Sequence, residues 1–233
     1  MPSAPPQASL FSHQSLDLWH FERRARRRRF RRIAGVDEVG RGPLAGPVVA
    51  AAVVLPWGLD LPEVRDSKQL SAAQRQACFD RIRAVAAAVG IGVVSAEEID
   101  HINILAATLE AMRQAVNQID PLPDFVIVDG PWKVALQLPQ QPLKCGDQLS
   151  ISVAAASIVA KVHRDKMMVS YHDVYPQYNF AQNKGYGTRE HRDALARFGS
   201  CPLHRQTFRG VQGSCQKARS YPALFTKPDR ETV

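Results

Sequence analysis

The sequence predicts an α/β fold in which helices flank a mixed β-sheet. Two β-type segments stand next to each other early in the chain, over residues 33–39 and 48–55, and further strands then alternate with helices. This order is typical of a sheet covered by helices. The 233 residues suit one domain with appendages, and without a continuous run of about 18 apolar residues we expect no transmembrane helix.

The elements of the first half follow from turn and cap patterns. Residues 33–39 and 48–55 are joined by the glycine-rich segment 40–43, which predicts an antiparallel pair. Ser71 and Gln74 form the pattern of a capping box, so we expect a helix from there to about Val89, with Gly90 as its stop. A short strand is expected over residues 91–95.

The second half is predicted to alternate in the same way. Residues 103–119 carry an apolar stripe at helical spacing, and residues 125–128 form an apolar strand that ends at Asp129. A long helix is expected from about residue 148 to 175, because Pro176 disfavours its continuation. A last helix is expected between a Thr188 cap and Gly199.

Charge is divided unevenly along the chain. The formal net charge is +8, yet residues 1–32 hold eight Arg against two acids, residues 205–233 carry +4, and the segment between them is −2. We expect a flexible, Arg-rich basic arm over residues 1–32, an ordered domain over 33–211 and a basic tail over 212–233. Basic ends around a slightly acidic centre suit a protein that holds a polyanion at its margins.

The four cysteines are scattered without the spacing of a zinc site, and the arm lacks the apolar segment of a secretory signal. Reduced thiols and a cytoplasmic location are therefore expected.

Four acids stand at places where a core element normally excludes them. Asp37 and Glu38 interrupt the first strand, Asp129 ends a buried strand, and Asp147 precedes a largely apolar helix. Buried carboxylates need cations or protons as partners, and an all-oxygen set selects hard ions such as Mg²⁺ or Mn²⁺. Two such ions about 4 Å apart can clamp the attacking and leaving oxygens of a phosphoryl displacement.

Simpler explanations remain for some of these acids. Taken alone, Asp129 with Gly130 is more often a turn, and Asp147 is more often a helix cap. Neighbouring side chains on a regular strand point to opposite faces, so Asp37 and Glu38 can share an ion only if the strand ends or twists there. The following Gly40 makes such a break plausible.

Six motifs occur in a fixed order along the chain. They are Ile33-Ala34-Gly35-Val36-Asp37-Glu38-Val39-Gly40-Arg41-Gly42, Asp66-Ser67-Lys68-Gln69-Leu70-Ser71, Val128-Asp129-Gly130, Lys144-Cys145-Gly146-Asp147, residues 154–165, and Gly185-Tyr186-Gly187-Thr188 followed by Pro202-Leu203-His204-Arg205. Together they resemble bacterial ribonuclease HII, the type 2 ribonuclease H, over about residues 33–211. His163 stands where that family often has Thr, which leaves one peripheral phosphate contact open.

The resemblance implies a ribonuclease H-like fold, with a five-stranded mixed sheet flanked by helices and a helical C-terminal portion. It implies that Asp37, Glu38, Asp129 and Asp147 bind the metal ions and carry out catalysis. The implied activity is endonucleolytic hydrolysis of the RNA strand of RNA/DNA hybrids, and incision on the 5′ side of single ribonucleotides in duplex DNA, with 3′-hydroxyl and 5′-phosphate ends.

The substrate contacts implied by the resemblance lie in loops and on one helix. Gly40, Arg41 and Gly42 follow the metal ligands, and their glycines let the backbone approach a sugar. Tyr186 resembles the residue that packs on the next deoxyribose. Ser67 and Lys68 are expected at a backbone phosphate, whereas Lys161 and Arg164 are either substrate contacts or an ion-pair cluster with Asp165.

The arm carries two further expectations. Gln7-Ala8-Ser9-Leu10-Phe11 resembles the short peptide with which bacterial replication proteins bind the sliding clamp, although an unstructured tail is the simpler interpretation. The Arg run is expected either to contact phosphates outside the cleavage site or to serve as a solvated linker.

Two other classes of protein share some of these sequence features. A non-catalytic nucleic-acid binder explains the basic ends but leaves the four acids unexplained. A related nuclease, such as a junction resolvase or a type 3 ribonuclease H, shares the acids, but the 32 arm residues are too few for the extra N-terminal domain of the type 3 enzymes. We therefore expect a monomeric type 2 enzyme.

Overall fold

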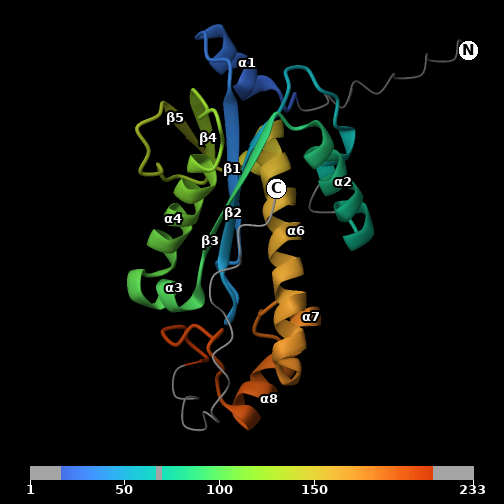
Figure 1. The fold of residues 1–233 in the computed structure, drawn as a ribbon, viewed down its shortest axis with the longest axis vertical. Helices are drawn as coiled ribbons and strands as arrows, with labels where there is room; N and C mark the ends of the chain where they lie inside the picture. Colours follow the sequence, from blue (N-terminus) through green and yellow to red (C-terminus); the bar gives the residue numbers. More distant parts are fainter. Residues whose placement is uncertain (1–16, 67–69, 212–233) are drawn as a thin grey trace, which may run out of the picture.

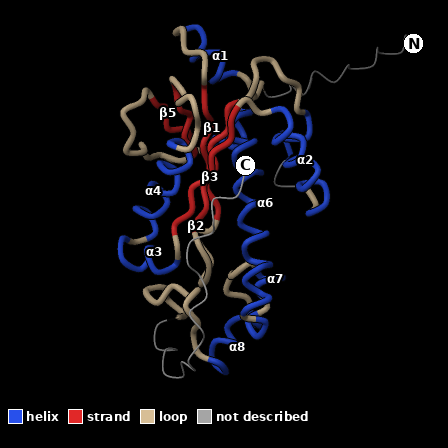
Figure 2. Tube along the Cα trace, in the orientation of Figure 1, coloured by secondary structure: helices blue, strands red, loops and turns tan. Residues whose placement is uncertain are grey.

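The computed structural model describes residues 17–66 and 70–211. Its centre is a five-stranded mixed sheet in the order β3-β2-β1-β4-β5, with β1 antiparallel to β2 and parallel to β4 (Figures 1 and 2). The strands are β1 (Ile33–Val39), β2 (Val48–Val54), β3 (Ala88–Val94), β4 (Phe125–Asp129) and β5 (Gln140–Leu143). The predicted fold class is confirmed.

Helices cover both faces of this sheet, and more helix is gathered at one end of the molecule (Figure 1). The α-helices are α1 (His20–Arg27), α2 (Ala72–Val85), α3 (Ala96–Ile102), α4 (Ile104–Asn117), α5 (Gly146–Leu149), α6 (Ile151–Val174), α7 (Phe180–Asn183) and α8 (Arg189–Phe198). Two 3-10 helices, η1 (Pro62–Asp66) and η2 (Pro176–Tyr178), complete the described elements. No helix within residues 17–66 and 70–211 has the length and apolar character that crossing a membrane requires.

The alternation of side chains along β2 divides the core into two layers. Ala50 and Ala52 face α4 and pack with Met112 and Val116, while Ala51 and Val53 face α6 on the other side. Every residue of β2 is buried because the strand lies between two neighbours and under helices on both faces. The central strand β1 lies next to β2 and is largely buried, so the acids at its end follow a segment that is shielded from water.

Helix α6 approaches β1 more closely than ordinary side chains permit. A Cβ atom built on Gly35 would lie 2.1 Å from the backbone carbon of Ser152, so only glycine fits at this crossing. Two residues further along β1, Asp37 therefore faces α6 at short range. The close crossing is what brings the long helix to the acids.

The boundary between α2 and β3 differs from the predicted one. The capping box of Ser71 and Gln74 is present, but α2 ends at Val85 and Gly90 lies inside β3. The helix stop expected at Gly90 is wrong, because this glycine instead allows β3 to lie against α4, where a Cβ atom would stand 2.0 Å from the carbonyl oxygen of Ala115. A local pattern of glycine and apolar residues does not distinguish these two uses.

Other boundaries are close to those expected. Thr188 caps α8 through its hydroxyl and Gly199 follows the helix, as predicted. The long helix α6 begins at Ile151, after the separate short helix α5. Helix α3 and strand β5 were not located from the sequence patterns; Asn103, expected inside a helix, has a φ of 70° and separates α3 from α4 as the cap of α4.

The ordered part of the chain begins before Ile33. Residues 17–32 are described and contain α1. Leu18, just before this helix, is 5% exposed, and Ala25, within it, is 2% exposed. Ala25 packs with Ile33 and Phe125, and the Phe30 and Phe125 rings lie 4.7 Å apart. The expectation of a flexible arm is therefore wrong for residues 17–32, because a helix with apolar residues on one face docks against the sheet.

Candidate active site

Three carboxylates meet at the ends of the adjacent parallel strands β1 and β4. Asp37, Glu38 and Asp129 each offer an oxygen within 4.8 Å of the others. The parallel register pairs Val36 with Val128, which places Asp37 and Asp129 at the same level of the sheet. The sequence separates these acids by more than 90 residues, and the strand pairing brings them together.

Asp37 is buried, and its carboxylate faces α6. It accepts hydrogen bonds from the backbone N–H of Glu38, at 2.7 Å, and from the side chain of Ser157. Burial is the main reason that the pKa of Asp37 is raised well above its ordinary value, and repulsion from Glu38 and Asp129 adds to it. The Asp37 carboxylate thus lies next to the backbone of the following residue, and oxygens of the neighbouring acids Asp37 and Glu38 reach one site.

Glu38 is partly buried and is the member of the group that pairs with an arginine. Burial raises its pKa and Asp129 adds repulsion, while Arg41, 3.4 Å away, offsets part of the effect. The side chain of Arg41 is 49% exposed, so solvent screens its pairing with Glu38, and no positive charge is paired with Asp37 or Asp129 among the described residues. The group therefore carries excess negative charge in a poorly solvated place.

Asp129 is held from the segment that follows β5. The backbone N–H of Gly146 donates to its Oδ1 at 2.6 Å, and Cys145 just before it adopts the left-handed conformation with a φ of 56°. Burial raises the pKa of Asp129, and the charge of Asp147 raises it further. The turn at Cys145 therefore positions the Gly146 N–H that holds Asp129, and it places Asp147 directly after that glycine.

Asp147 lies in α5, is 7% exposed, and is close enough to influence the pKa of Asp129. It is not among the three carboxylates whose oxygens lie within 4.8 Å of one another. The structure thus brings three of the four predicted acids into one group and places Asp147 beside it.

These residues fit a divalent cation by their chemistry. The donors are carboxylate oxygens, they repel one another, and Arg41 is the cation paired with them among the described residues. A hard ion with oxygen preference, such as Mg²⁺ or Mn²⁺, offsets both the repulsion and the burial. A zinc site, by contrast, normally adds Cys or His ligands.

A cavity of about 380 Å³ adjoins the carboxylates. Its lining combines Glu38 with residues of α2 and α6 and with Tyr186: Glu38, Val39, Arg75, Ser157, Ile158, Lys161 and Tyr186. Tyr186 is 43% exposed and faces the loop after β1, where a Cβ on Gly42 would lie 3.8 Å from its ring. The predicted residues Gly42, Tyr186 and Lys161 therefore lie around one opening.

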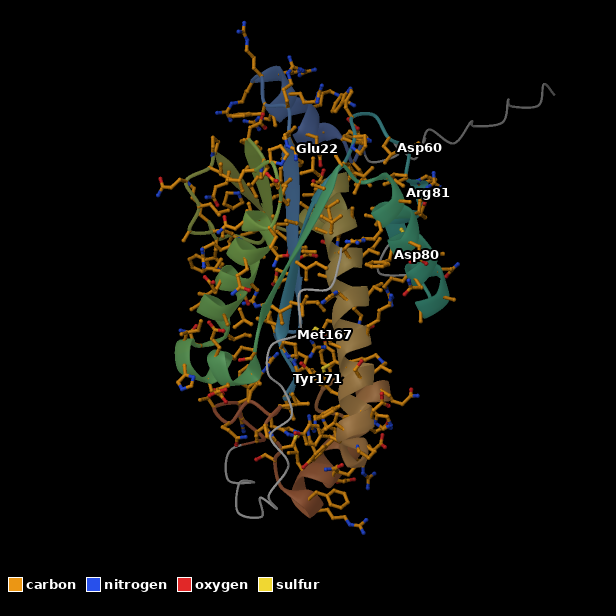
Figure 3. The ribbon with its side chains drawn as sticks, in the orientation of Figure 1. Glu22, Asp60, Asp80, Arg81, Met167 and Tyr171 are labelled. Atoms are coloured by element: carbon orange, nitrogen blue, oxygen red, sulfur yellow. The ribbon has the colours of Figure 1, made fainter. Side chains whose placement is uncertain are left out.

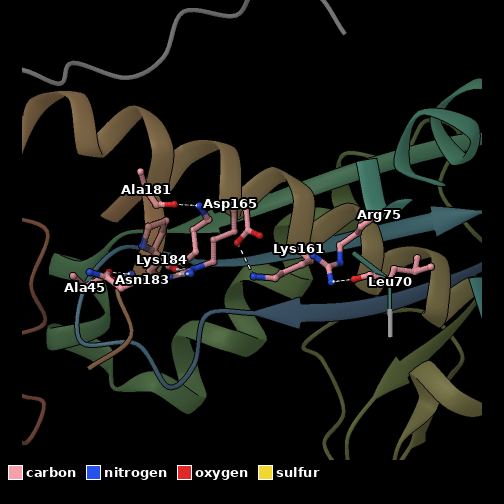
Figure 4. A network of polar contacts seen from close by, with 11 residues as sticks. Ala45, Leu70, Arg75, Lys161, Asp165, Ala181, Asn183 and Lys184 are labelled. Carbon is pink, nitrogen blue, oxygen red and sulfur yellow. Dashed lines mark hydrogen bonds and ion pairs between the residues drawn. The ribbon is translucent and has the colours of Figure 1, made fainter. Parts of the chain in front are cut away.

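Lys161 and Arg164 have different environments although both lie on α6. Lys161 lines the cavity and pairs with Asp165 at 2.7 Å, as Figure 4 shows beside Arg75. Arg164 is fully buried and donates to the carbonyl oxygens of Ala45, Pro47 and Lys184. A substrate contact for Arg164 is wrong, because its donors are used inside the protein to hold the segment after Gly42.

Arg205 is a functional candidate to which sequence reasoning assigned no role. It is fully buried, and its guanidinium donates to the carbonyl oxygens of Gly40, Arg41, Pro43 and Gly46. Gly40 has a φ of 97°, a conformation that a residue with a side chain rarely adopts. Arg205 thus holds the shape of the loop that follows the metal-ligand candidates. Its position in the Pro202-Leu203-His204-Arg205 motif is the sequence feature that could have indicated a role for Arg205.

Some predicted residues are peripheral or outside the description. His163 is half-buried on α6, and burial together with Lys166 and Arg83 lowers its pKa, which favours the neutral ring. Ser67, Lys68 and the segment Gln7–Phe11 lie outside the described residues, as does the tail 212–233.

The sequence profile of the family described as Ribonuclease HII matches residues 34–211. A ribonuclease HII from Geobacter sulfurreducens is 53% identical over 212 residues, covering 91% of this chain and 98% of that protein. A ribonuclease HII from Syntrophobacter fumaroxidans is 54% identical over 200 residues, 86% of each chain.

Solved structures give the same result for the fold. The ribonuclease H2 of Pyrococcus horikoshii OT3 superposes with a TM-score of 0.67 at 25% identity, covering 79% of this chain and 97% of that one. The RNase HII in a PCNA:RNase HII complex from Archaeoglobus fulgidus has a TM-score of 0.64 at 22% identity, with coverages of 83% and 98%. Bst-RNase HIII in complex with Mn²⁺ reaches 0.61 at 20% identity, with coverages of 78% and 68%.

The profile match spans the acids of β1, β4 and α5 together with the Arg205 loop, and the curated relatives share more than half of their residues with this chain over nearly their whole lengths. The chain therefore belongs to the ribonuclease HII family.

Proposed function

We propose that the protein is a metal-dependent endoribonuclease that hydrolyses the RNA strand of RNA/DNA hybrids and incises duplex DNA 5′ of single embedded ribonucleotides. The products carry 3′-hydroxyl and 5′-phosphate ends. The observation that carries this proposal is the group of Asp37, Glu38 and Asp129 within 4.8 Å, next to an open cavity. Membership of the family supports the same activity.

The carboxylates of Asp37, Glu38, Asp129 and Asp147 hold the divalent ions, Mg²⁺ or Mn²⁺, in a two-ion arrangement. Ions held by these residues would supply activation of a water nucleophile and neutralisation of negative charge on the leaving oxygen. The protein supplies the positions: Ser157 orients Asp37, and the N–H of Gly146 orients Asp129. Carboxylates suit a water nucleophile, whereas attack by the ribose 2′-hydroxyl normally uses a pair of histidines.

Recognition of the ribonucleotide falls to the loop after β1 and to Tyr186. A 2′-hydroxyl is the only difference between a ribonucleotide and its neighbours in the DNA strand, so a group near the reacting phosphate has to sense it. Gly40, Arg41 and Gly42 present backbone groups there, and Tyr186 offers a half-exposed ring across the opening. Lys161 lies at the cavity wall, where it can meet a phosphate if its pair with Asp165 opens.

The test compares three duplexes of one length and sequence: all-DNA, DNA with one ribonucleotide, and an RNA/DNA hybrid. Each is incubated with Mg²⁺, with Mn²⁺ or with EDTA. We expect cleavage of the last two duplexes with either metal, a cut 5′ of the single ribonucleotide, and no cleavage in EDTA. Full cleavage in EDTA, or equal cleavage of the all-DNA duplex, contradicts the proposal.

A matched pair of variants separates catalysis from binding in this assay. Asp37→Asn removes one charge from the carboxylate group, whereas Asp193→Asn removes one from the exposed face of α8. We expect loss of cleavage with retained duplex binding in the first variant and no change in the second. A non-catalytic nucleic-acid binder would show no cleavage in any of the proteins.

We also propose that residues 7–11 bind the bacterial sliding clamp, on the resemblance of Gln7-Ala8-Ser9-Leu10-Phe11 to clamp-binding peptides. The Archaeoglobus fulgidus protein was solved as a PCNA:RNase HII complex, which is a related kind of partnership. A pull-down with purified clamp, lost on the double change Leu10→Ala and Phe11→Ala, is the expected result. Absence of binding by the unchanged protein contradicts it.

We also propose that the enzyme is a monomer and that it acts in the cytoplasm. Light scattering of the purified protein at micromolar concentration checks the first point, with a mass near 25.8 kDa expected. A dimer mass contradicts it.

A further inference from the structure

The eight arginines of residues 23–32 divide into two sets. Four are engaged: Arg23 pairs with Asp17 at 2.6 Å, Arg26 lies over the Trp57 ring, Arg28 lies over the Phe30 ring, and Arg32 donates to the carbonyl oxygen of Pro121. The other four, Arg24, Arg27, Arg29 and Arg31, are exposed, and their side chains make no hydrogen bond or ion pair to residues 17–66 or 70–211.

Helix α1 carries Arg24 and Arg27 and is followed by Arg29 and Arg31, and it is attached to the domain by buried contacts. Its Glu22 is 1% exposed and accepts hydrogen bonds from the hydroxyl of Ser150, at 2.6 Å, and the backbone N–H of Ser152, at 3.1 Å. Figure 3 shows Glu22 where α1 meets the sheet and the start of α6. Ala25 packs on the same side. The opposite side of α1 is therefore held outward as a rigid, charged surface.

This attachment also places α1 near the carboxylates. Ser150, the partner of Glu22, is three residues after Asp147, and three residues of chain span at most about 11 Å. A cavity of about 600 Å³ beside α1 is lined by Arg28 and by Lys133 of the β4–β5 loop, which extends the positive charge. A duplex bound at the carboxylates and extending toward α1 would meet this positively charged side of the molecule.

We propose that Arg24, Arg27, Arg29 and Arg31 bind backbone phosphates of the duplex outside the cleavage site; this inference rests on the proposed function. Asp124 accepts the backbone N–H of Arg31 at 2.7 Å, but no acid within residues 17–66 and 70–211 pairs with the four guanidinium groups. Four like charges of this kind repel one another, and a polyanion relieves this repulsion. Guanidinium groups suit phosphate oxygens through paired hydrogen bonds. The contacts carry no sequence information and raise affinity for any duplex that presents a ribonucleotide to the site.

The experiment measures the salt dependence of duplex binding in EDTA, where no cutting is expected. The test variant is R24Q/R27Q/R29Q/R31Q, and the control is R189Q/R192Q/R197Q/R209Q, which removes the same charge from the opposite end of the molecule, at and after α8 (Figure 1). Each lost phosphate contact lowers the slope of log Kd against log salt by about 0.9 on duplex. We expect a decrease of about 2 to 3.6 in the test variant and less than about 1 in the control.

Single-turnover cleavage at saturating enzyme is measured on the same proteins. It should stay within about twofold of the unchanged protein, because the arginines touch no reacting group. The variant R24K/R27K/R29K/R31K retains the charge and should keep most of the slope, which separates charge from folding. If the charge-removing variants lower the slope equally, or if the α1 variant leaves it unchanged, the inference is overturned, and the surface then serves an acidic protein or no partner. If no protein cleaves, the proposed function fails, while the slopes still decide this inference.

Discussion

The guanidinium of Arg205 donates a 2.5 Å hydrogen bond to the carbonyl oxygen of Gly40, across 165 residues of sequence. Gly40 stands two residues after Glu38, so the C-terminal part of the domain directly supports the loop beside the carboxylates. Burial lowers the pKa of Arg205 to about 9, and the group is still protonated at pH 7. Its hydrogen bonds to four backbone carbonyls keep this buried charge solvated by the protein.

Arg205→Lys should destabilise the protein and weaken catalysis. Lysine offers three donors without the planar fork, so several carbonyls of the loop lose their partner, at a cost of about 3 kcal/mol in the free energy of unfolding. We expect a lower midpoint in urea and slower single-turnover cleavage. Arg209→Lys, at an exposed position of the same segment, is the control and should change neither quantity. An unchanged urea midpoint in Arg205→Lys would show that the loop after β1 keeps its conformation without the guanidinium.

Asp129→Asn should abolish cleavage and raise the thermal stability of the metal-free protein. The charge of Asp129 is half-buried near Asp37, Glu38 and Asp147, and neutralising it relieves repulsion that no metal ion offsets in EDTA. Differential scanning calorimetry in EDTA checks the shift, and we expect an increase of a few degrees. With added Mg²⁺ the unchanged protein should gain stability and the variant should gain less. A lower melting temperature of the variant in EDTA contradicts the repulsion argument.

Tyr186→Ala should reduce incision at single ribonucleotides more than cutting within an RNA/DNA hybrid. The ring is half-exposed opposite Gly42, where it can pack on the deoxyribose that follows a ribonucleotide. A ten-fold larger loss on the single-ribonucleotide duplex is the expected scale, which corresponds to about 1.4 kcal/mol of binding in the transition state. Tyr186→Phe keeps the ring and should keep most of the selectivity. Equal losses on both substrates would assign Tyr186 a purely structural role.

Acid should destabilise the protein through a buried histidine pair. The Nε2 atoms of His191 and His204 lie 3.0 Å apart, and burial, with repulsion from His191, lowers the pKa of His204 to about 3. In the unfolded chain His204 is protonated below about pH 6.5, whereas in the folded protein it stays neutral down to about pH 3. The free energy of unfolding therefore falls as the pH drops from about 6.5 toward 3. This group contributes about 1.4 kcal/mol per pH unit in that window.

Urea unfolding between pH 4 and pH 7 measures this contribution. His204→Gln removes the titrating group and should flatten the dependence, whereas His101→Gln, at an exposed position, should leave it as it is. Parallel pH curves for the unchanged protein and His204→Gln would refute the assignment.

Local patterns and the resemblance together predicted much of this protein. The β1–β2 pair, the Ser71 capping box, the Thr188 cap and the placement of acids at strand ends are set by residues near one another in sequence. Such features depend on local hydrogen bonds and on side-chain alternation, and the sequence displays both. Family membership could also be predicted from the motifs, since it is a property of the sequence itself.

Other features depend on contacts that only the tertiary structure decides. Arginine density made residues 17–32 read as flexible, yet Glu22 and Ala25 find partners on α6 and the sheet, and their burial orders α1. Lys161 and Arg164 are alike in sequence, but one turn of α6 faces the cavity and the next faces buried carbonyls. Gly90 reads as a helix stop until α4 is packed against β3. In each case the outcome depends on what an element meets across the fold, because burial and hydrogen bonding to distant segments outweigh the local preference.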